Sequence, residues 1–401
     1  MKSTFSFLLW GFLVFALLPA PALSSTLEST STPSLITAAT PLPVATRAGA
    51  GVPPVTAMTA SRAGGEWDSL VAEARKEGSV VVYIAPIGEA RDIAAKTFKE
   101  KYGISIDFVT GRGAELINKI TTERNAGLYT VDAMLMGLGT FFNMIGPMKI
   151  TVPLEPLLML PEVTDGTKWR MGNVLFVDKA KTCIAFSLTS LHCISINTDL
   201  VKEGEITSFE DILAPKWKGK IVINDPSVGG HGAEWFQFMM LGPTYGKEKG
   251  RGYVMKLIEQ NPVMNRDQRL QTEWLARGKS LIGIGIEPSE IEKMAKLGAP
   301  VKVISVKEGS PLSSGPLNVM VFDRAPHPNA AKLFVNWVLS REGGEIMSKY
   351  SGYLSARLDV STAGFDPIFI PRSTDILPGE QYKLQAGELL KVAADMFKDL
   401  K

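Results

Sequence analysis

Four apolar stretches of this sequence each end in a short loop that contains glycine, and a helical pattern follows each loop. In an open α/β sheet such loops lie at the carboxyl ends of the strands, where ligands bind. The helices that start there offer unpaired N–H groups and partial positive charge, which suit an anion. The repeated unit therefore predicts a ligand cleft. The four loops are Ala85–Gly88, Thr110–Gly113, Gly137–Thr140 and Asp225–Gly232.

Two side chains in these loops have chemistry that suits an anion. Arg112 stands between two glycines, and a guanidinium there could clasp a carboxylate or phosphonate through two hydrogen bonds. His231 follows Gly230, so its backbone N–H and that of Gly232 could hold an anion at the start of the next helix. The simpler alternatives are a solvent-exposed arginine and an imidazole that only caps or packs.

Two hydroxyl groups are further candidates. Ser314 and, more weakly, Ser187 lie where the chain is expected to cross between two halves of the fold. A hydroxyl at such a crossing can face the ligand. The alternative for both is a polar hinge turn.

Motifs that would indicate an enzyme or a metal centre do not occur in the sequence. It has no Gly-x-Ser-x-Gly, no His-Glu-x-x-His and no phosphate-binding loop ending in Lys-Ser or Lys-Thr. The three histidines, His192, His231 and His327, are far apart and belong to no metal-binding motif. We therefore expect a protein that is not an enzyme and that holds no cofactor and no metal.

The composition of the 401 residues excludes one class of partner. The chain carries 43 basic and 41 acidic side chains, well mixed, for a net charge of +2. A nucleic-acid-binding protein would show a basic stripe. We expect a monomer that binds no nucleic acid.

The first 64 residues have the pattern of an export signal and a tether. Lys2, an apolar stretch and the small residues Ala20 and Ala22 predict a secretory signal peptide over residues 1–25; the alternative is an uncleaved anchor. No cysteine lies nearby to carry a lipid. Residues 26–64, rich in Ser, Thr, Pro and Ala, predict a flexible linker. The expected location is periplasmic or extracellular.

The two cysteines, Cys183 and Cys193, fall in the strand-like runs 181–187 and 191–197. If these runs form a hairpin, the two residues share a face and could lie opposite one another. The sequence leaves two alternatives open, a disulfide in an exported protein or two buried free thiols.

Strand and helix patterns alternate through the remaining chain. Strands at 80–84, 104–109 and 131–136 with helical patterns between them imply parallel pairing through right-handed crossovers. A second α/β unit opens at 221–224. The pattern predicts two α/β lobes with a hinge and a cleft, lobe I comprising 65–190 and 313–350 and lobe II comprising 191–312 and 351–401. Further helices are expected at 67–77, 233–241, 252–260, 270–277, 329–339 and 379–400, and further strands at 281–286, 301–306 and 317–322.

Seven short segments match a known family in order and spacing. They are Gly78–Tyr83, Glu123–Gly127, Asn197–Val201, Ala214–Lys220, Ala276–Lys279, Ala325–Phe334 and Leu339–Gly344. Through them the chain resembles the extracellular solute-binding proteins of ABC importers, specifically the subfamily that contains the periplasmic ferric-ion-binding proteins. The resemblance implies a type II periplasmic-binding fold, in which two lobes close on a small solute and deliver it to a membrane permease.

The iron ligands of those relatives are missing from this chain. Their tyrosine pair follows the strand that corresponds to 281–286, where this sequence has Glu287-Pro288-Ser289-Glu290. Their histidine and acidic ligand would fall near Ile87 and Gly137. Fe(III) is a hard cation that needs anionic oxygen donors, which these two residues lack. We therefore reject ferric iron as the solute.

The resemblance adds two candidates. Glu287 could accept a hydrogen bond from a ligand amine or hydroxyl, or pair with Arg112 in an empty cleft, and Asn265 lies in a loop that reaches the cleft in relatives. The hypothesis is a substrate-binding component of an ABC importer for a small organic anion; the alternatives are a ligand-sensing module for a membrane receptor and a ferric or other metal-ion binder. The candidate ligand-binding residues are Ile87, Arg112, Gly137, Ser187, Gly230, His231, Gly232, Asn265, Glu287 and Ser314.

Overall fold

The computed structural model describes residues 55–377 and 379–400. The predicted signal peptide and the predicted linker as far as residue 54 lie outside these residues. The linker prediction is wrong for residues 55–64, because helix α1 (Val55–Glu77) already begins at Val55. Alanine, methionine and arginine in this stretch favour a helix, and the accompanying serine and threonine hid that preference.

The first sheet of the described chain has six strands in the order β2-β1-β3-β13-β5-β4. Strand β1 pairs in parallel with β2 and β3, whereas β13 pairs antiparallel with β3 and β5. The predicted parallel unit is therefore confirmed. The bounds are β1 Ser79–Ile84, β2 Ser105–Thr110, β3 Ala133–Leu135, β4 Leu175–Phe176, β5 Ile184–Ala185 and β13 Asn318–Val321.

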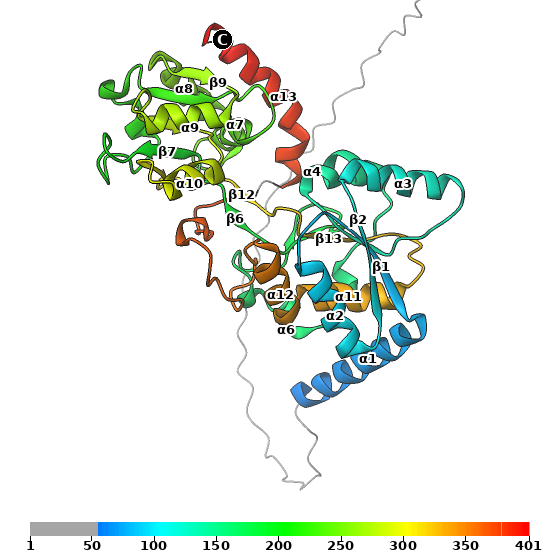
Figure 1. Cartoon of the computed structure of the whole chain (residues 1–401). Helices are drawn as coiled ribbons and strands as arrows, with labels where there is room; N and C mark the ends of the chain where they lie inside the picture. The colour runs from blue at the N-terminus through cyan, green and yellow to red at the C-terminus, as the bar shows by residue number, and fades with distance from the viewer. Residues whose placement is uncertain (1–54, 378, 401) are drawn as a thin grey trace, which may run out of the picture. The chain divides into compact units, whose positions relative to one another are not determined.

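Helices cover this six-stranded sheet. Helix α12 packs against α2 and α11, and α11 also packs against α1 and β1 (Figure 1). An aromatic cluster joins these helices, with the ring centroids of Phe98 and Trp337 5.2 Å apart in an edge-to-face arrangement that favours the quadrupoles of both rings. The bounds are α2 Ala90–Tyr102, α3 Gly113–Asn125, α11 Pro328–Leu339 and α12 Arg341–Ser351.

The second sheet has five strands in the order β11-β7-β10-β8-β9. Strand β10 pairs in parallel with β8 and antiparallel with β7. The predicted strands at 221–224, 281–286 and 301–306 are found here, with β9 and helix α10 as additions. The bounds are β7 Ile194–Asn197, β8 Ile221–Asn224, β9 Val263–Asn265, β10 Ile282–Ile284, β11 Val301–Ile304, α7 His231–Leu241, α8 Gly246–Glu259, α9 Gln268–Ala276, α10 Pro288–Lys296 and α13 Glu380–Met396.

A two-stranded sheet joins the segments that run between the larger sheets. Strand β6 (Thr189–Ser190) pairs antiparallel with β12 (Leu312–Ser313), and Ile376 adds a parallel bridge beside them through its backbone bonds to Ser310 and Leu312. Three strands of chain therefore lie side by side where the sequence predicts the hinge.

The remaining elements are short, and they connect the longer ones. They are α4 Leu138–Thr140, the π-helix η1 Phe141–Ile145, α5 Gly146–Met148, η2 Glu155–Leu157, α6 Pro161–Thr164, η3 Gly166–Lys168, η4 Glu210–Leu213, η5 Pro215–Trp217, η6 Pro367–Phe369 and η7 Lys398–Leu400. Within the described residues, no helix has both the length and the hydropathy needed to cross a membrane.

The hairpin expected around the two cysteines does not form. Strand β5 pairs with β13 and β4, whereas β7 pairs with β10 and β11, so the two runs enter different sheets. Cys183 and Cys193 are accordingly free and buried in separate hydrophobic clusters. Burial raises the pKa of each thiol well above its usual value, so both remain protonated.

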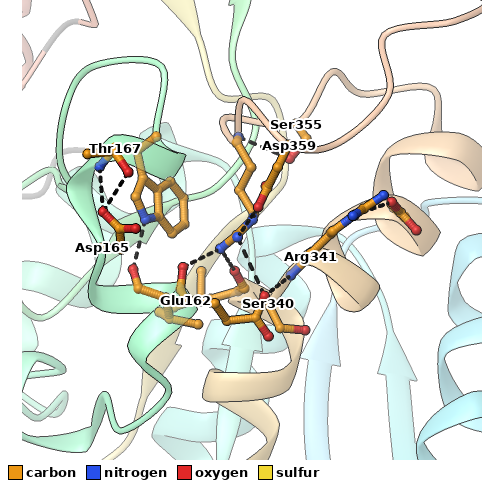
Figure 2. A network of polar contacts seen from close by, with 12 residues as sticks. Glu162, Asp165, Thr167, Ser340, Arg341, Ser355 and Asp359 are labelled. Carbon is orange, nitrogen blue, oxygen red and sulfur yellow. Dashed lines mark hydrogen bonds and ion pairs between the residues drawn. The ribbon is translucent and has the colours of Figure 1, made fainter. Parts of the chain in front are cut away.

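A buried arginine attaches the segment after α12 to the six-stranded sheet. Arg357 is 1% exposed and donates two hydrogen bonds of 2.8 Å to the carboxylate of Asp359. The same guanidinium donates to the carbonyl oxygens of Glu162 and Leu339, both at 3.0 Å. Figure 2 shows Glu162 and Asp359 in this network. Each of the three side-chain nitrogens therefore donates at least one hydrogen bond.

The charge of Arg357 also affects the protonation of its partner, Asp359. Burial acts to raise the pKa of Asp359, but the hydrogen bonds and the positive charge of Arg357 outweigh it, and the pKa is lowered. Asp359 therefore stays ionised at neutral pH, which keeps the buried pair charged on both sides.

Candidate functional site

A cavity of about 320 Å³ is enclosed by segments that belong to both large sheets and to the hinge. Its wall combines glycine backbone, leucine side chains and a few polar groups, and among the described residues that line it Glu234 alone is charged. The lining residues are Gly137, Leu138, Gly139, Leu191, Glu234, Gln237, Pro311, Leu312, Ser313, Ser314 and Gly315.

The fold brings these residues together through the ends of strands. Gly137 follows the end of β3 and precedes the short helix α4, while Ser313 ends β12 and leads into Ser314. Leu191 follows β6, the partner strand of β12. On the side of the five-stranded sheet, Glu234 and Gln237 lie three residues apart on α7 and thus on one face of that helix.

Two glycines allow the start of α7 to pack directly on the five-stranded sheet. A Cβ at Gly232 would lie 2.3 Å from the carbonyl oxygen of Asn224, at the end of β8. Gly285 has a φ of +70°, and a Cβ there would lie 2.6 Å from the Cα of Gly232. A larger residue at either position would displace the helix. These contacts set the position of the first turn of α7, which carries Glu234.

The hydroxyl of Ser314 is buried in this wall without a partner. The residue is 2% exposed, and its Oγ makes no hydrogen bond. Its backbone is held in place, because Ser187 donates to the Ser314 carbonyl and Asn318 donates to the Gly315 carbonyl at 3.1 Å. A buried hydroxyl without a partner costs free energy, and a bound solute could remove that cost.

Glu234 likewise presents an unpaired acceptor. Its Oε2 is inaccessible to solvent and makes no hydrogen bond. The imidazole Nε2 of His231 lies 3.7 Å from that oxygen, beyond hydrogen-bond range, and is itself unpaired. On its other side, His231 Nδ1 lies 3.6 Å from Oε2 of Glu287, the residue that precedes α10. The imidazole therefore stands between two carboxylates.

Backbone donors complete the wall. The N–H groups of Leu138 and Gly139 have no acceptor in the described part of the chain, because they open α4, whose own bonds begin at Thr140. The residues that carry these donors and the residue that carries the unpaired carboxylate oxygen thus line the same cavity, and a solute that reaches these groups can both accept and donate hydrogen bonds.

The hinge beside the cavity contains a buried histidine. His192 donates from Nε2 to the carbonyl of Ile368, so its Nδ1 is the acceptor for the Ser310 hydroxyl at 3.1 Å. Burial lowers the pKa of His192, the Ile368 carbonyl and Asp375 act to raise it, and the charge of Arg372 acts to lower it. The pKa is lowered overall. His192 is therefore neutral at neutral pH and is part of the hinge structure.

Four sequence-predicted site residues lie in or beside the cavity. Gly137 and Ser314 line it, Ser187 binds the Ser314 backbone, and His231 contacts the carboxylate of Glu234. Gly230 and Gly232 flank His231 at the start of α7, and Glu287 contacts the same imidazole.

The structure places the three other candidates away from the lining residues. Ile87 is 5% exposed and packs in the core of the six-stranded sheet. Arg112 is exposed at the start of α3, where its backbone N–H donates to the Glu115 carboxylate and its carbonyl accepts from the Leu116 N–H. Asn265 accepts from Asp267 and Gln271 and so has a local structural role.

The sequence interpretation missed Glu234 and Gln237, the two side chains that α7 contributes. A signal was present, since Glu234 stands three residues after His231 and shares its helix face. Of the described residues, no group of three or more His, Cys, Asp or Glu side chains is arranged to hold a metal ion.

Comparison with known proteins connects this geometry to a family. Residues 94–369, more than half of the chain, match the family of bacterial extracellular solute-binding proteins. The chain belongs to this family. It is therefore a solute-binding protein of ABC transport, of a family that works outside the cytoplasm, and the prediction that it is not an enzyme is confirmed by that membership.

Relatives agree with the assignment. An uncharacterised protein of Haemophilus influenzae is 25% identical over 307 residues, which cover 73% of this chain and 83% of the relative. The structure is similar to that of Trichodesmium IdiA (FutA) in complex with iron and citrate, with a TM-score of 0.59, 18% identity and coverage of 80% of this chain and 99% of the other. The structure is also similar to that of an ABC transporter from Clostridium perfringens. The TM-score is 0.60 and the identity 15%, and the likeness covers 80% of this chain and 99% of the other. These likenesses confirm the predicted periplasmic-binding fold.

Proposed function

We propose that this solute-binding protein captures a small organic anion between two lobes and delivers it to the membrane permease of an ABC importer. The lobes are those expected from the sequence, 65–190 with 313–350 and 191–312 with 351–401. One observation carries the proposal: segments of both large sheets and of the hinge line one cavity that contains unpartnered polar atoms.

The size of the cavity supports a small solute. A volume of about 320 Å³ is at the lower end of the range of ligand pockets, roughly 300–1,000 Å³. The free N–H groups of Leu138 and Gly139 and the hydroxyl of Ser314 supply donors for an anionic or strongly accepting group.

The chemistry of the lining argues against ferric iron as the solute. Fe(III) requires several anionic oxygen donors, and the lining of the cavity has a single carboxylate, that of Glu234. The iron and citrate of the Trichodesmium relative belong to a protein only 18% identical, whose likeness establishes the fold and not the cargo.

Native mass spectrometry of the purified mature chain tests the proposal. We expect a complex with one small organic anion, released on denaturation and detected in negative-ion mode, and no iron by elemental analysis. Recovery of stoichiometric iron, or a chain that retains no solute and binds no member of a panel of carboxylates, phosphates and phosphonates, would contradict it.

A further inference from the structure

The cavity contains a negative charge that nothing in its wall balances. Glu234 lines it, its Oε2 is buried and unbonded, and no lysine or arginine is among the lining residues. The nearest cationic candidate is the imidazole of His231, 3.7 Å away, and Glu287 is at a similar distance on the other side of that ring. Two carboxylates therefore share one imidazole, and an excess of negative charge remains at the wall.

A bound solute that excludes water would make this charge more costly. A buried carboxylate needs an opposite charge or strong donors to replace its hydration. A neutral hydroxyl would supply one hydrogen bond and leave the charge in place. An ammonium group supplies both the charge and up to three donors.

We propose that Glu234 selects solutes that carry a protonated amine, so that the solute is a small zwitterion. This inference rests on the proposed function, which supplies the anionic end of the solute. The free hydroxyl of Ser314 and the amide of Gln237, one turn along the same face of α7, line the same cavity and can bind the polar groups next to the ammonium.

The position of Glu234 is fixed before the solute arrives. Its helix is held by the close contact of Gly232 with the end of β8, and its backbone N–H bonds to the Gly230 carbonyl at 3.0 Å. Because the carboxylate does not need to be reordered when the solute binds, no binding free energy is lost in positioning it for an ammonium group.

Matched compounds test the inference on the full mature chain. The probes are γ-aminobutyrate, 4-hydroxybutyrate and butyrate, together with O-phosphoethanolamine, ethylene glycol phosphate and ethyl phosphate, measured by thermal shift and by calorimetry. We expect at least one amine to bind, and its hydroxyl and unsubstituted counterparts to bind at least about tenfold more weakly. Equal affinities within a set, or the absence of binding by either amine, would overturn the proposal.

The variant Glu234→Gln keeps the shape of the side chain and removes its charge. It should weaken the binding of the amine about tenfold or more, and the unsubstituted counterpart should bind as tightly as before or more tightly. Glu248→Gln, an equal charge change on the exposed surface of α8, should alter neither. An affinity for the amine that is the same in Glu234→Gln as in wild type would overturn the proposal. If this variant fails to fold, the affinities of the wild-type protein for the matched amine, hydroxyl and unsubstituted compounds still test the proposal.

The outcome also separates this inference from the proposed function. A retained solute that lacks an amine and binds more weakly to the Ser314→Ala variant would overturn the role of Glu234 and support the capture of an anion. A chain that retains nothing and binds none of the six probes would count against both.

Discussion

Two buried polar groups of this protein differ in how completely they are bonded. Around Arg357 the guanidinium meets the Asp359 carboxylate and two backbone carbonyls, and each of its three nitrogens donates at least one hydrogen bond. In the cavity, the Ser314 hydroxyl and the Glu234 Oε2 have no partner. A buried group with hydrogen-bond partners stabilises one conformation. A buried polar atom without a partner raises the free energy of the unliganded protein, and a ligand that bonds to it removes that penalty. The first region therefore concerns stability, and the second concerns binding.

The largest expected effect comes from Arg357→Met, which leaves Asp359 without its buried partner. The free energy of unfolding should fall by about 2–4 kcal/mol, because the Glu162 and Leu339 carbonyls lose their buried donor and Asp359, which is 25% exposed, loses its charged partner. Chemical denaturation measures it. Arg341→Met is the control, because Arg341 pairs with Glu345 on the exposed surface and should contribute less than about 1 kcal/mol. Equal decreases in the free energy of unfolding for the two variants would show that the buried network contributes no more to stability than an exposed ion pair.

A second prediction concerns the helix that carries Glu234. Gly232→Ala should destabilise the protein by about 1–3 kcal/mol, because its Cβ would meet the Asn224 carbonyl oxygen at 2.3 Å. Gly252→Ala, in the interior of α8 with no atom near the new Cβ, should instead stabilise it by about 0.5–1 kcal/mol. Thermal unfolding of both variants checks the opposite signs, and a neutral Gly232→Ala would mean that α7 shifts freely.

These two glycines also illustrate what sequence can and cannot predict. The glycine loop before His231 predicted a helix start correctly, because loop composition and apolar periodicity are local properties. The reason that Gly232 must be glycine is the approach of β8, which no local pattern encodes. The same holds for Arg357, whose acceptors come from Glu162 and Leu339, far away in the sequence.

The candidate site was predicted in part for the same reason. Gly137 follows the predicted strand 131–136, and Ser314 lies at the predicted crossing between the two halves; both line the cavity. Glu234 was missed because a charged residue on a helix normally faces solvent. The expected cysteine hairpin was wrong because the segment 188–190, interpreted as a turn, contains strand β6 (Thr189–Ser190), whose partner lies more than 120 residues later in the chain. Such pairing is not visible in one sequence.

A third prediction concerns the hinge and depends on pH. Burial lowers the pKa of His192 below its ordinary value of 6.5, with Arg372 also lowering it and Asp375 opposing. The unfolded chain therefore binds a proton that the folded hinge excludes. The stability from neutral His192 is complete above pH 6.5 and is lost as the pH falls from there towards the lowered pKa. Unfolding free energies at several pH values, for wild type and His192→Gln, check this; an identical pH dependence in both would contradict it.

The most direct measurement compares two serines whose buried hydroxyls both lack a partner. Ser314 lines the cavity, whereas Ser348 is buried on α12, which packs against helices α2 and α11. Ser314→Ala should raise the dissociation constant of the co-purified solute roughly 2–10-fold with little change in stability. Ser348→Ala should leave the dissociation constant unchanged. If both variants, or neither, changed the dissociation constant, the cavity would not be the place where this protein holds its solute.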